Sequence, residues 1–340
     1  MTLTPRLASK LPLILRRASL VKEIEIALSK QLSILQLQGR ATMSLLKRAM
    51  LTHVTALTFI CVGLCLGIVP TLIDVVLRPM LYIFNTKPIH VRFADMRHRF
   101  FYSSWRYMSS IIDSVDASVK APVIRKAYGR VLEVGGGIGD NIKYYARDQV
   151  KQLILVEPNI HMHRLLRQKA NAAGFLEKED SLMLLSCGAA ANDEKVLAEA
   201  GVTANSIDSV VCIHVLCSIP EADAAVDLYR RLLKPGGLLL FFEHVRSADM
   251  STAKWQKWYT DIIWRNLFDG CELDRPTGEW ILHGSFEDNE VKGQSTSRHG
   301  QDTDYDTKTK TRWTDYNLVT LNRWDMDGCT PHIMGHAVKA

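Results

Sequence analysis

Short apolar runs alternate with amphipathic segments through the middle of the chain. Runs of five to nine residues that are rich in Val, Leu, Ile and Phe predict strands. They cover residues 130–134, 152–156, 182–186, 209–216, 238–242 and 331–339. Segments with helical spacing lie between them at 141–146, 160–173 and 224–233. Because short apolar strands that alternate with helices form parallel sheets covered on both faces, the pattern predicts a doubly wound α/β fold with right-handed crossovers.

Residues 49–84 have a different pattern, because apolar side chains dominate without a short period. No Asp, Glu, Lys or Arg occurs between Ala49 and Ile73. Twenty-five helical residues extend roughly 37 Å, which exceeds the hydrocarbon core of a bilayer. The segment is therefore predicted to be a hydrophobic helical membrane anchor. It either spans the bilayer or forms an interfacial hairpin, since Arg78 and Pro79 interrupt its continuation. The alternative is a buried helix of the protein core.

The N-terminal residues 1–48 are basic. The first fifty residues hold nine Lys and Arg against only Glu23 and Glu25, within a net charge of +6 for all 340 residues. This bias favours an anionic membrane surface over nucleic acid, and an ordinary solvated stretch is the alternative. The extension fits an amphipathic helix, a mitochondrial transit peptide, or sequence that precedes a true start at Met43 or Met50.

Residues 85–340 are predicted to form one domain, which the helical segment 85–128 introduces. Residues 289–317 are polar, with many Gly, Ser, Thr, Asp and Lys, and predict a long surface loop inserted in that domain. The seven cysteines are irregularly spaced and form no C-x-x-C pair, so the sequence predicts neither a metal site nor a dithiol centre. They are interpreted as reduced thiols that face a cytosol-like compartment.

A glycine-rich segment, Val131-Leu-Glu-Val-Gly-Gly-Gly-Ile-Gly139, contains the first strand and the loop after it. Gly135, Gly137 and Gly139 allow a sharp turn and let the backbone approach a ligand. The acid Glu133 precedes the loop, and Asp140 stands where a dinucleotide site would have its third glycine. An acid before the loop suits a cationic, amino-acid-bearing ligand better than a pyrophosphate.

Two further segments are predicted to complete this ligand site. Glu157, followed by Pro158, ends the second strand about twenty residues after the loop, where a carboxylate binds ribose hydroxyls. Gly188 lies among small residues after the third strand, where an adenine edge fits, and no acid follows until Asp193. The loop spacing with Glu133 and Glu157 points to S-adenosylmethionine.

Three candidate catalytic residues lie at the ends of the fourth and fifth strands. His214 is predicted to leave the sheet beside the cofactor, where it either contacts cofactor, orients substrate or accepts a proton. Glu243 and His244 end the fifth strand at the same edge and are expected to line the substrate entrance. A packing role is the alternative for His214.

Several of these segments together resemble one family. The segments 131–139, 208–219, 234–245, 268–271 and 331–339 are similar to methyltransferase-like protein 7, the membrane-anchored alkyl thiol methyltransferases. The resemblance covers roughly residues 50–286 and the last ten. It departs from the family at Gly136, at the basic extension and at the polar insertion.

The resemblance implies a Rossmann-like, mostly parallel seven-stranded sheet of the class I methyltransferases. It also implies S-adenosylmethionine-dependent methylation of small hydrophobic thiols at the endoplasmic reticulum membrane, often with lipid droplets, and a catalytic domain facing the cytosol. A mitochondrial membrane is the alternative location. Methylation of oxygen or carbon on a lipid or quinone is the rival activity, and a membrane-associated protein that binds the cofactor without catalysis is the rival class.

Overall fold

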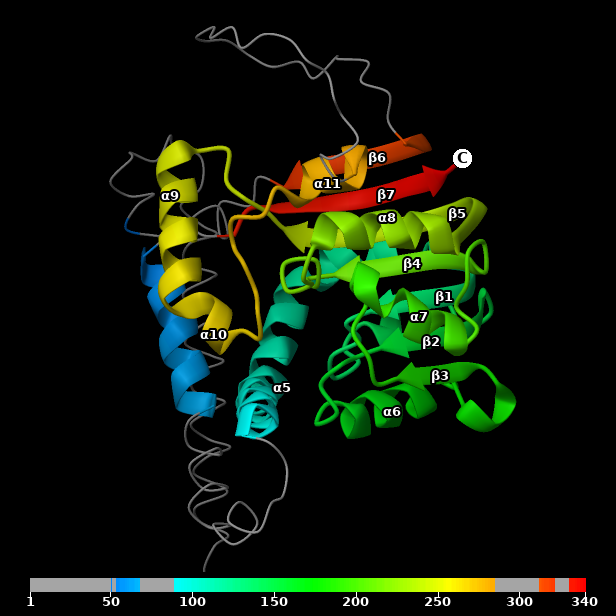
Figure 1. The fold of residues 1–340 in the computed structure, drawn as a ribbon, viewed down its shortest axis with the longest axis horizontal. Helices are drawn as coiled ribbons and strands as arrows, with labels where there is room; N and C mark the ends of the chain where they lie inside the picture. Colours follow the sequence, from blue (N-terminus) through cyan, green and yellow to red (C-terminus); the bar gives the residue numbers. More distant parts are fainter. Residues whose placement is uncertain (1–49, 51–52, 68–88, 285–311, 322–329) are drawn as a thin grey trace, which may run out of the picture.

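The computed structural model describes residues 50, 53–67, 89–284, 312–321 and 330–340 of the chain. Their centre is one sheet of seven strands in the order β3-β2-β1-β4-β5-β7-β6 (Figure 1). The strands β1 to β5 pair in parallel, and β7 runs antiparallel between β5 and β6. The predicted α/β sheet, mostly parallel and seven-stranded, is confirmed.

The strands lie close to the positions that the apolar runs predicted. Their bounds are β1 Gly129–Val134, β2 Val150–Val156, β3 Leu182–Leu185, β4 Ile207–Ile213, β5 Leu233–His244, β6 Trp313–Leu321 and β7 His332–Lys339. Successive side chains of a strand point to opposite faces, so a strand covered on both faces is apolar at every position. In β2, for example, Leu153 and Leu155 join one core cluster and Ile154 and Val156 the other.

Helices cover both faces of the sheet. The α-helices are α5 Ile89–Ile124, α6 His163–Ala172, α7 Glu194–Glu199, α8 Ala222–Leu232, α9 Met250–Tyr259, α10 Arg265–Leu267 and α11 Thr277–His283. Residues of α5 and α6 pack on one face, and residues of α7, α8 and α11 pack on the other. Short 3₁₀ turns lie at η1 Ile142–Tyr144, η2 Glu177–Glu179 and η3 Ala191–Asp193, and a π-helical turn η4 spans Thr260–Trp264.

A further helix over residues 53–67 packs beside α9 and α10 and away from the sheet (Figure 1). Its Ala56 and Ile60 belong to a third apolar cluster together with Trp264 and Phe268. The His53 Nδ1 lies 2.8 Å from the Tyr259 hydroxyl, which fixes this helix against α9. In the described part of the chain, no helix combines the length and the apolar character needed to cross a membrane. Residues 49, 51–52 and 68–84 of the predicted anchor lie outside the described ranges.

Three local predictions need correction. Residues 141–146 form only the 3₁₀ turn η1 instead of a helix. The fourth strand ends at Ile213, before the predicted Leu216, because His214 adopts a left-handed φ of 53° that a strand does not accommodate.

The prediction of a surface loop over residues 289–317 is also wrong at its C-terminal end, because residues 313–317 belong to β6. This strand lies at the edge of the sheet and exposes most of its side chains. Its residues are therefore largely polar, and the hydrophobic pattern did not predict a strand here. The preceding part of the segment, residues 289–311, lies outside the described residues.

Gly335 allows β7 to sit between two strands. It pairs with Phe241 of β5 and Leu318 of β6, and its φ is +159°. A Cβ at this position would lie 1.7 Å from the backbone oxygen of Asn317. We expect Gly335→Ala to lower the free energy of unfolding by more than about 2 kcal/mol, because the β6 backbone must move away. Chemical denaturation measures this.

The matched control is Gly278→Ala in α11, whose new Cβ would meet Ile333 at an ordinary 3.5 Å. We expect the control to be as stable as the native chain or slightly more stable, because alanine favours helix. Equal stability of the two variants would contradict the assigned pairing of β6 with β7.

Candidate functional site

A cavity of about 460 Å³ opens at the carboxyl ends of the parallel strands. The glycine loop after β1, the end of β2 and the loop after β4 line one side. Residues of α5, the helix over 53–67 and the segment around α10 line the other side. Strands β1 and β4 lie next to each other although β2 and β3 come between them in sequence. This is the switch point where open α/β sheets bind ligands.

The glycine loop lies directly against the cavity. Gly135 and Gly137 have φ values of 66° and 54° and line it. A Cβ at Gly135 would lie 2.4 Å from Cγ2 of Val215, so the loop after β4 excludes any side chain here. Gly139 does not line the cavity, because it packs against Ile142 and Leu166. Gly139, which was also predicted to contact the ligand, therefore shapes the turn instead of the cavity wall.

Glu157 directly follows β2 and lines the cavity, as predicted, and Pro158 lines the cavity beside it. The backbone N–H of Gly137 donates to Oε2 of Glu157 at 2.8 Å, and the N–H of Asn159 donates to Oε1 at 2.8 Å. Burial raises the pKa of Glu157 to about 7, against these two hydrogen bonds that lower it. The carboxylate is thus held rigidly, with oxygens placed for hydroxyl donors of a ligand.

Glu133 is fully buried and does not line the cavity. It accepts hydrogen bonds from Asn141 Nδ2 and from the Tyr145 hydroxyl, both at 2.9 Å. Burial raises its pKa to about 7. Asn141 reaches the cavity itself, so Glu133 acts on the site by orienting Asn141.

Sequence reasoning missed Lys120 of α5, which is a buried cation at the cavity wall. Its Nζ lies 2.8 Å from Asp113 and donates to Asn141 Oδ1 at 2.9 Å. Lys120 is 4% exposed, and the buried carboxylate of Asp113 balances its charge. Together with the N–H groups of the glycine loop, it is placed to hold the carboxylate of an amino-acid-bearing ligand. The only sequence signal for Lys120 is its position in the helical period of α5. That signal does not distinguish a buried lysine from a surface lysine.

The small residues after β3 also line the cavity, as predicted for Gly188. The loop itself contains no acid, but the next acid along the chain, Asp193, folds back against the loop and lines the cavity. Its Oδ2 accepts from the N–H of Ala190 at 2.9 Å, and a Cβ at Gly188 would lie 2.4 Å from that oxygen. The 3₁₀ turn η3 brings this acid to the cavity wall.

His214 stands at the exit of β4 and lines the cavity. Its Nε2 lies 3.2 Å from Oδ2 of Asp116, a carboxylate of α5 whose side chain is 1% exposed. Burial lowers the pKa of His214, although Asp116 opposes this shift. The imidazole is therefore neutral at neutral pH, and the Asp116 contact favours the tautomer with its proton on Nε2. The remaining nitrogen, Nδ1, then carries the lone pair.

Glu243 and His244 have different surroundings, although they are adjacent at the end of β5. Glu243 is fully buried and lies outside the cavity lining. Its carboxylate accepts from the N–H groups of Val215 and Leu216 at 3.0 to 3.2 Å, so it holds the loop after β4. Burial raises its pKa to about 8. His244 does line the cavity, with its ring 6.5 Å from that of His214.

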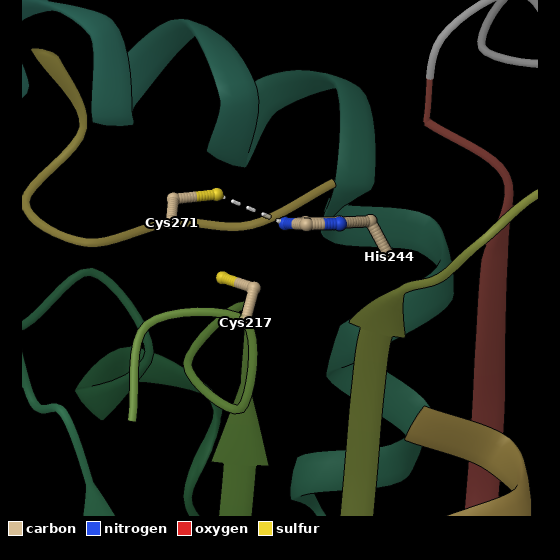
Figure 2. A group of neighbouring side chains, drawn as sticks. All are labelled: Cys217, His244 and Cys271. Carbon is tan, nitrogen blue, oxygen red and sulfur yellow. Dashed lines mark hydrogen bonds between the residues drawn. The ribbon is translucent and has the colours of Figure 1, made fainter. Parts of the chain in front are cut away.

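Two cysteines meet His244 at the cavity wall (Figure 2). Cys217 lies on the loop after β4 and Cys271 follows α10, and both line the cavity. His244 Nε2 lies 3.3 Å from Cys271 Sγ, and Trp264 Nε1 donates to the same sulfur at 3.2 Å. The sequence predicted no metal site at these cysteines, because the cysteines are irregularly spaced and form no C-x-x-C pair.

The rest of the cavity is apolar and largely aromatic. Its walls include Phe59, Phe101, Trp105, Met108, Trp264 and Phe268. They come from the helix over 53–67, from α5 and from the segment around α10. The cavity thus has a polar half at the glycine loop and an apolar half opposite.

A family model described as a methyltransferase domain matches residues 104–280. This match extends from within α5 into α11 and includes the glycine loop, Glu157 and His214. The chain belongs to the methyltransferase domain family. It uses S-adenosylmethionine as its cofactor, as the sequence predicted.

Curated relatives narrow this assignment. The mouse thiol S-methyltransferase TMT1B is 30% identical over 209 residues, which is 62% of this chain and 70% of that protein. The human thiol S-methyltransferase TMT1A is 32% identical over 46% of this chain and 59% of that protein. The predicted family, methyltransferase-like protein 7, is confirmed. The chain spans 70% of the length of the first of these relatives and 59% of the second.

Among solved structures, the [4+2]-cyclase SpnF is similar with a TM-score of 0.42 and 15% identity, over 68% of this chain and 81% of that one. Geranyl diphosphate methyltransferase in complex with SAM has a TM-score of 0.43 and 9% identity, over 72% and 90%.

The cofactor of this methyltransferase fits the residues of the polar half. The Glu157 carboxylate would accept from ribose hydroxyls, Gly188 and Asp193 would adjoin the adenine, and Lys120 with the glycine loop would hold the methionine carboxylate.

Glu157 gives the methyltransferase a pH-dependent stability. Its pKa is about 7 in the folded chain against an ordinary value of 4.5, so the folded state keeps a proton that the unfolded state has lost between those values. Stability therefore falls as pH rises through this window. Without cofactor, we expect the free energy of unfolding of the native chain to fall between about pH 5 and about pH 8. In Glu157→Gln we expect this fall to be about 1–3 kcal/mol smaller.

Urea denaturation at several pH values measures this difference, and Glu194→Gln on the exposed surface is the control. We also expect Glu157→Gln to bind S-adenosylmethionine at least about tenfold more weakly, because one ribose acceptor is lost. An unchanged slope with unchanged affinity would remove Glu157 from the site.

Proposed function

We propose that this methyltransferase S-methylates small hydrophobic thiols at a membrane surface. One observation carries the choice of acceptor: an aromatic cavity adjoins the glycine loop and holds the imidazole of His214, oriented by Asp116. The curated relatives are named thiol S-methyltransferases, which supports the same acceptor.

The chemistry requires alignment more than activation. The bound cofactor supplies a methyl group on a sulfonium, which already leaves readily. The protein has to exclude water and to place the acceptor sulfur in line behind that methyl group, and positioning of this kind accounts for a large part of many rate enhancements. The apolar half does both for a small apolar thiol, since its aromatic side chains leave few competing hydrogen-bond partners.

His214 is placed to accept the thiol proton. With Nε2–H directed at Asp116, Nδ1 is the basic atom, and the carboxylate stabilises the imidazolium that forms. A free thiol has a pKa of about 8.5, so a few per cent is thiolate at neutral pH without any base. The contribution of His214 is therefore modest near neutrality and smaller in alkali.

We expect His214→Ala and Asp116→Asn each to lower kcat for an alkyl thiol about 10- to 100-fold at neutral pH. The deficit should shrink toward about pH 9, where the acceptor ionises unaided. Cofactor affinity, measured by calorimetry, should change little. His336→Ala on β7, outside the cavity lining, is the control. A deficit that stays constant with pH would show that His214 does not act as the proton acceptor.

The same assay separates the rival activities. Thiols, phenols and quinols of matched size are compared with the native chain, and we expect thiol turnover alone to be efficient. Preference for phenols or quinols would favour O-methylation. Cofactor binding without turnover of any acceptor would favour a non-catalytic protein.

The membrane part of the proposal rests on an exposed apolar face beside the cavity. The helix over 53–67 exposes Val54 and Leu57, and the adjacent α9 and η4 segment exposes Trp255, Trp258 and Ile262. His53 stacks edge-on against Trp255 with centroids 4.4 Å apart, so the two segments form one surface. Exposed tryptophans on such a face are typical of the membrane interface.

Charge supports the same orientation, because Lys254 and Lys257 are exposed on α9 among these side chains. Basic residues around an aromatic face favour anionic lipid headgroups. The helix over 53–67 also contributes Phe59 to the cavity, so an apolar thiol dissolved in the bilayer would have a short route to the site. We propose an endoplasmic reticulum or lipid-droplet surface as the location, with the catalytic domain in the cytosol.

We expect the double variant Trp255→Ser, Trp258→Ser to bind vesicles of phosphatidylcholine and phosphatidylserine at least about tenfold more weakly than the native chain, because two interfacial anchors are lost. Flotation of the full chain with vesicles measures this. The control Tyr316→Ser removes an exposed aromatic side chain from β6, far from α9 in Figure 1. Equal loss in both would show that this face is not the contact surface.

A further inference from the structure

Three soft or borderline ligand atoms converge at one wall of the cavity. They are the sulfurs of Cys217 and Cys271 and a ring nitrogen of His244, and all lie within 4.8 Å of one another. The three side chains point toward a common centre although they come from separate segments (Figure 2). Their exposed fractions are 3%, 8% and 6%, so the cluster is shielded from bulk water.

This set of atoms matches the ligand preference of zinc. Zn²⁺ binds thiolate sulfur at about 2.3 Å and imidazole nitrogen at about 2.0–2.1 Å, in a tetrahedral arrangement. Two such ligands on one tetrahedral ion lie about 3.5 Å apart. The observed separation of 3.3 Å between His244 Nε2 and Cys271 Sγ is close to that value. A small closure of the remaining atoms would complete three bonds.

Trp264 supplies a second, independent observation. Its indole N–H donates to Cys271 Sγ at 3.2 Å. A hydrogen bond to a ligand sulfur stabilises the thiolate form, and outer contacts of this kind orient metal ligands. Trp264 ends the π-helical turn η4, an uncommon conformation that is frequent at functional sites.

We propose that Cys217, His244 and Cys271 bind one Zn²⁺ whose fourth position faces the cavity and takes the sulfur of the acceptor thiol. Three protein ligands with one open position are the pattern of catalytic rather than structural zinc, and two cysteines with one histidine are a known set of this kind. The inference rests on the proposed thiol acceptor and names how the site holds it.

The chemical step is balanced without an oxidant or reductant. The acceptor sulfur bonds to zinc while its S–H bond breaks, and the proton passes to His214, whose ring lies 6.5 Å from that of His244. An electron pair of the bound sulfur then forms the new S–CH₃ bond as the sulfonium C–S bond of the cofactor breaks. The products are a neutral thioether and S-adenosylhomocysteine. The thioether is a weaker ligand than a thiolate and leaves the metal.

The experiment measures metal binding apart from activity. The reduced full chain is stripped with a chelator and titrated with Zn²⁺, and separately with Co²⁺, whose thiolate charge-transfer bands report tetrahedral sulfur ligation. We expect about one ion per chain, and at least about tenfold weaker binding in Cys217→Ser, Cys271→Ser and His244→Ala. Cys61→Ser, which removes an exposed thiol outside the cavity, is the control and should bind normally.

Trp264→Phe keeps all three ligands and an aromatic core side chain, so it tests the site even if a ligand variant fails to fold. We expect its Zn²⁺ affinity to fall about 10-fold, as for loss of an outer hydrogen bond. Addition of an alkyl thiol with S-adenosylhomocysteine should shift the Co²⁺ bands of the native chain, since the sulfur enters the fourth position. No shift would overturn that part of the inference.

The outcomes separate the two proposals. Zinc binding with a thiol-dependent shift but no methyl transfer would leave the site standing and refute the proposed function. Full thiol turnover by chelator-treated chain that binds neither ion would refute the zinc site and leave the function standing. A Cys217–Cys271 disulfide with no metal binding after reduction would also refute the zinc site.

Discussion

The buried carboxylate of Glu243 fixes the loop on which both halves of the site depend. It accepts the N–H groups of Val215 and Leu216 at the point where β4 ends. Those two groups would otherwise lack strand partners, and an unpaired buried N–H costs on the order of 1–3 kcal/mol. With the loop fixed, His214 adopts its left-handed φ and Cys217 faces the cavity. The same loop brings Val215 against Gly135, so it also shapes the cofactor side.

The cavity combines two kinds of construction. Its polar half consists of strand ends and short loops of a single sheet, where the order of the strands sets the geometry, together with Lys120 of α5. Its apolar half is formed by helices outside the sheet, including α5, the helix over 53–67 and the η4 turn. Packing of aromatic side chains holds that half together, and the third apolar cluster is its core.

Several acids in this enzyme are buried, and each has a defined set of donors. Burial raises the pKa values of Glu133, Glu157 and Glu243 to about 7, 7 and 8. Of these three, Glu157 reaches the cavity, while the other two orient Asn141 and the loop after β4.

Local patterns in the sequence were enough to locate the sheet and most of the polar half of the cavity. Apolar runs placed most strands within a few residues, and Gly135, Gly137, Glu157 and Gly188 were found because they follow strand ends in order. Spacing along the chain carries that information, since ligands bind at the carboxyl edge of parallel strands. The edge strand β6 escaped detection, because exposed polar side chains give little periodicity.

The apolar half of the cavity could be defined only from the tertiary structure. The Asp116–His214 contact spans 98 positions, and Cys217 and Cys271 also lie in separate segments, so no local pattern links the members of either group. The buried state of Lys120, and the return of Asp193 to the loop after β3, also depend on packing. Strand ends are encoded by short-range hydrophobic pattern, whereas these contacts arise when separate helices meet over one sheet edge.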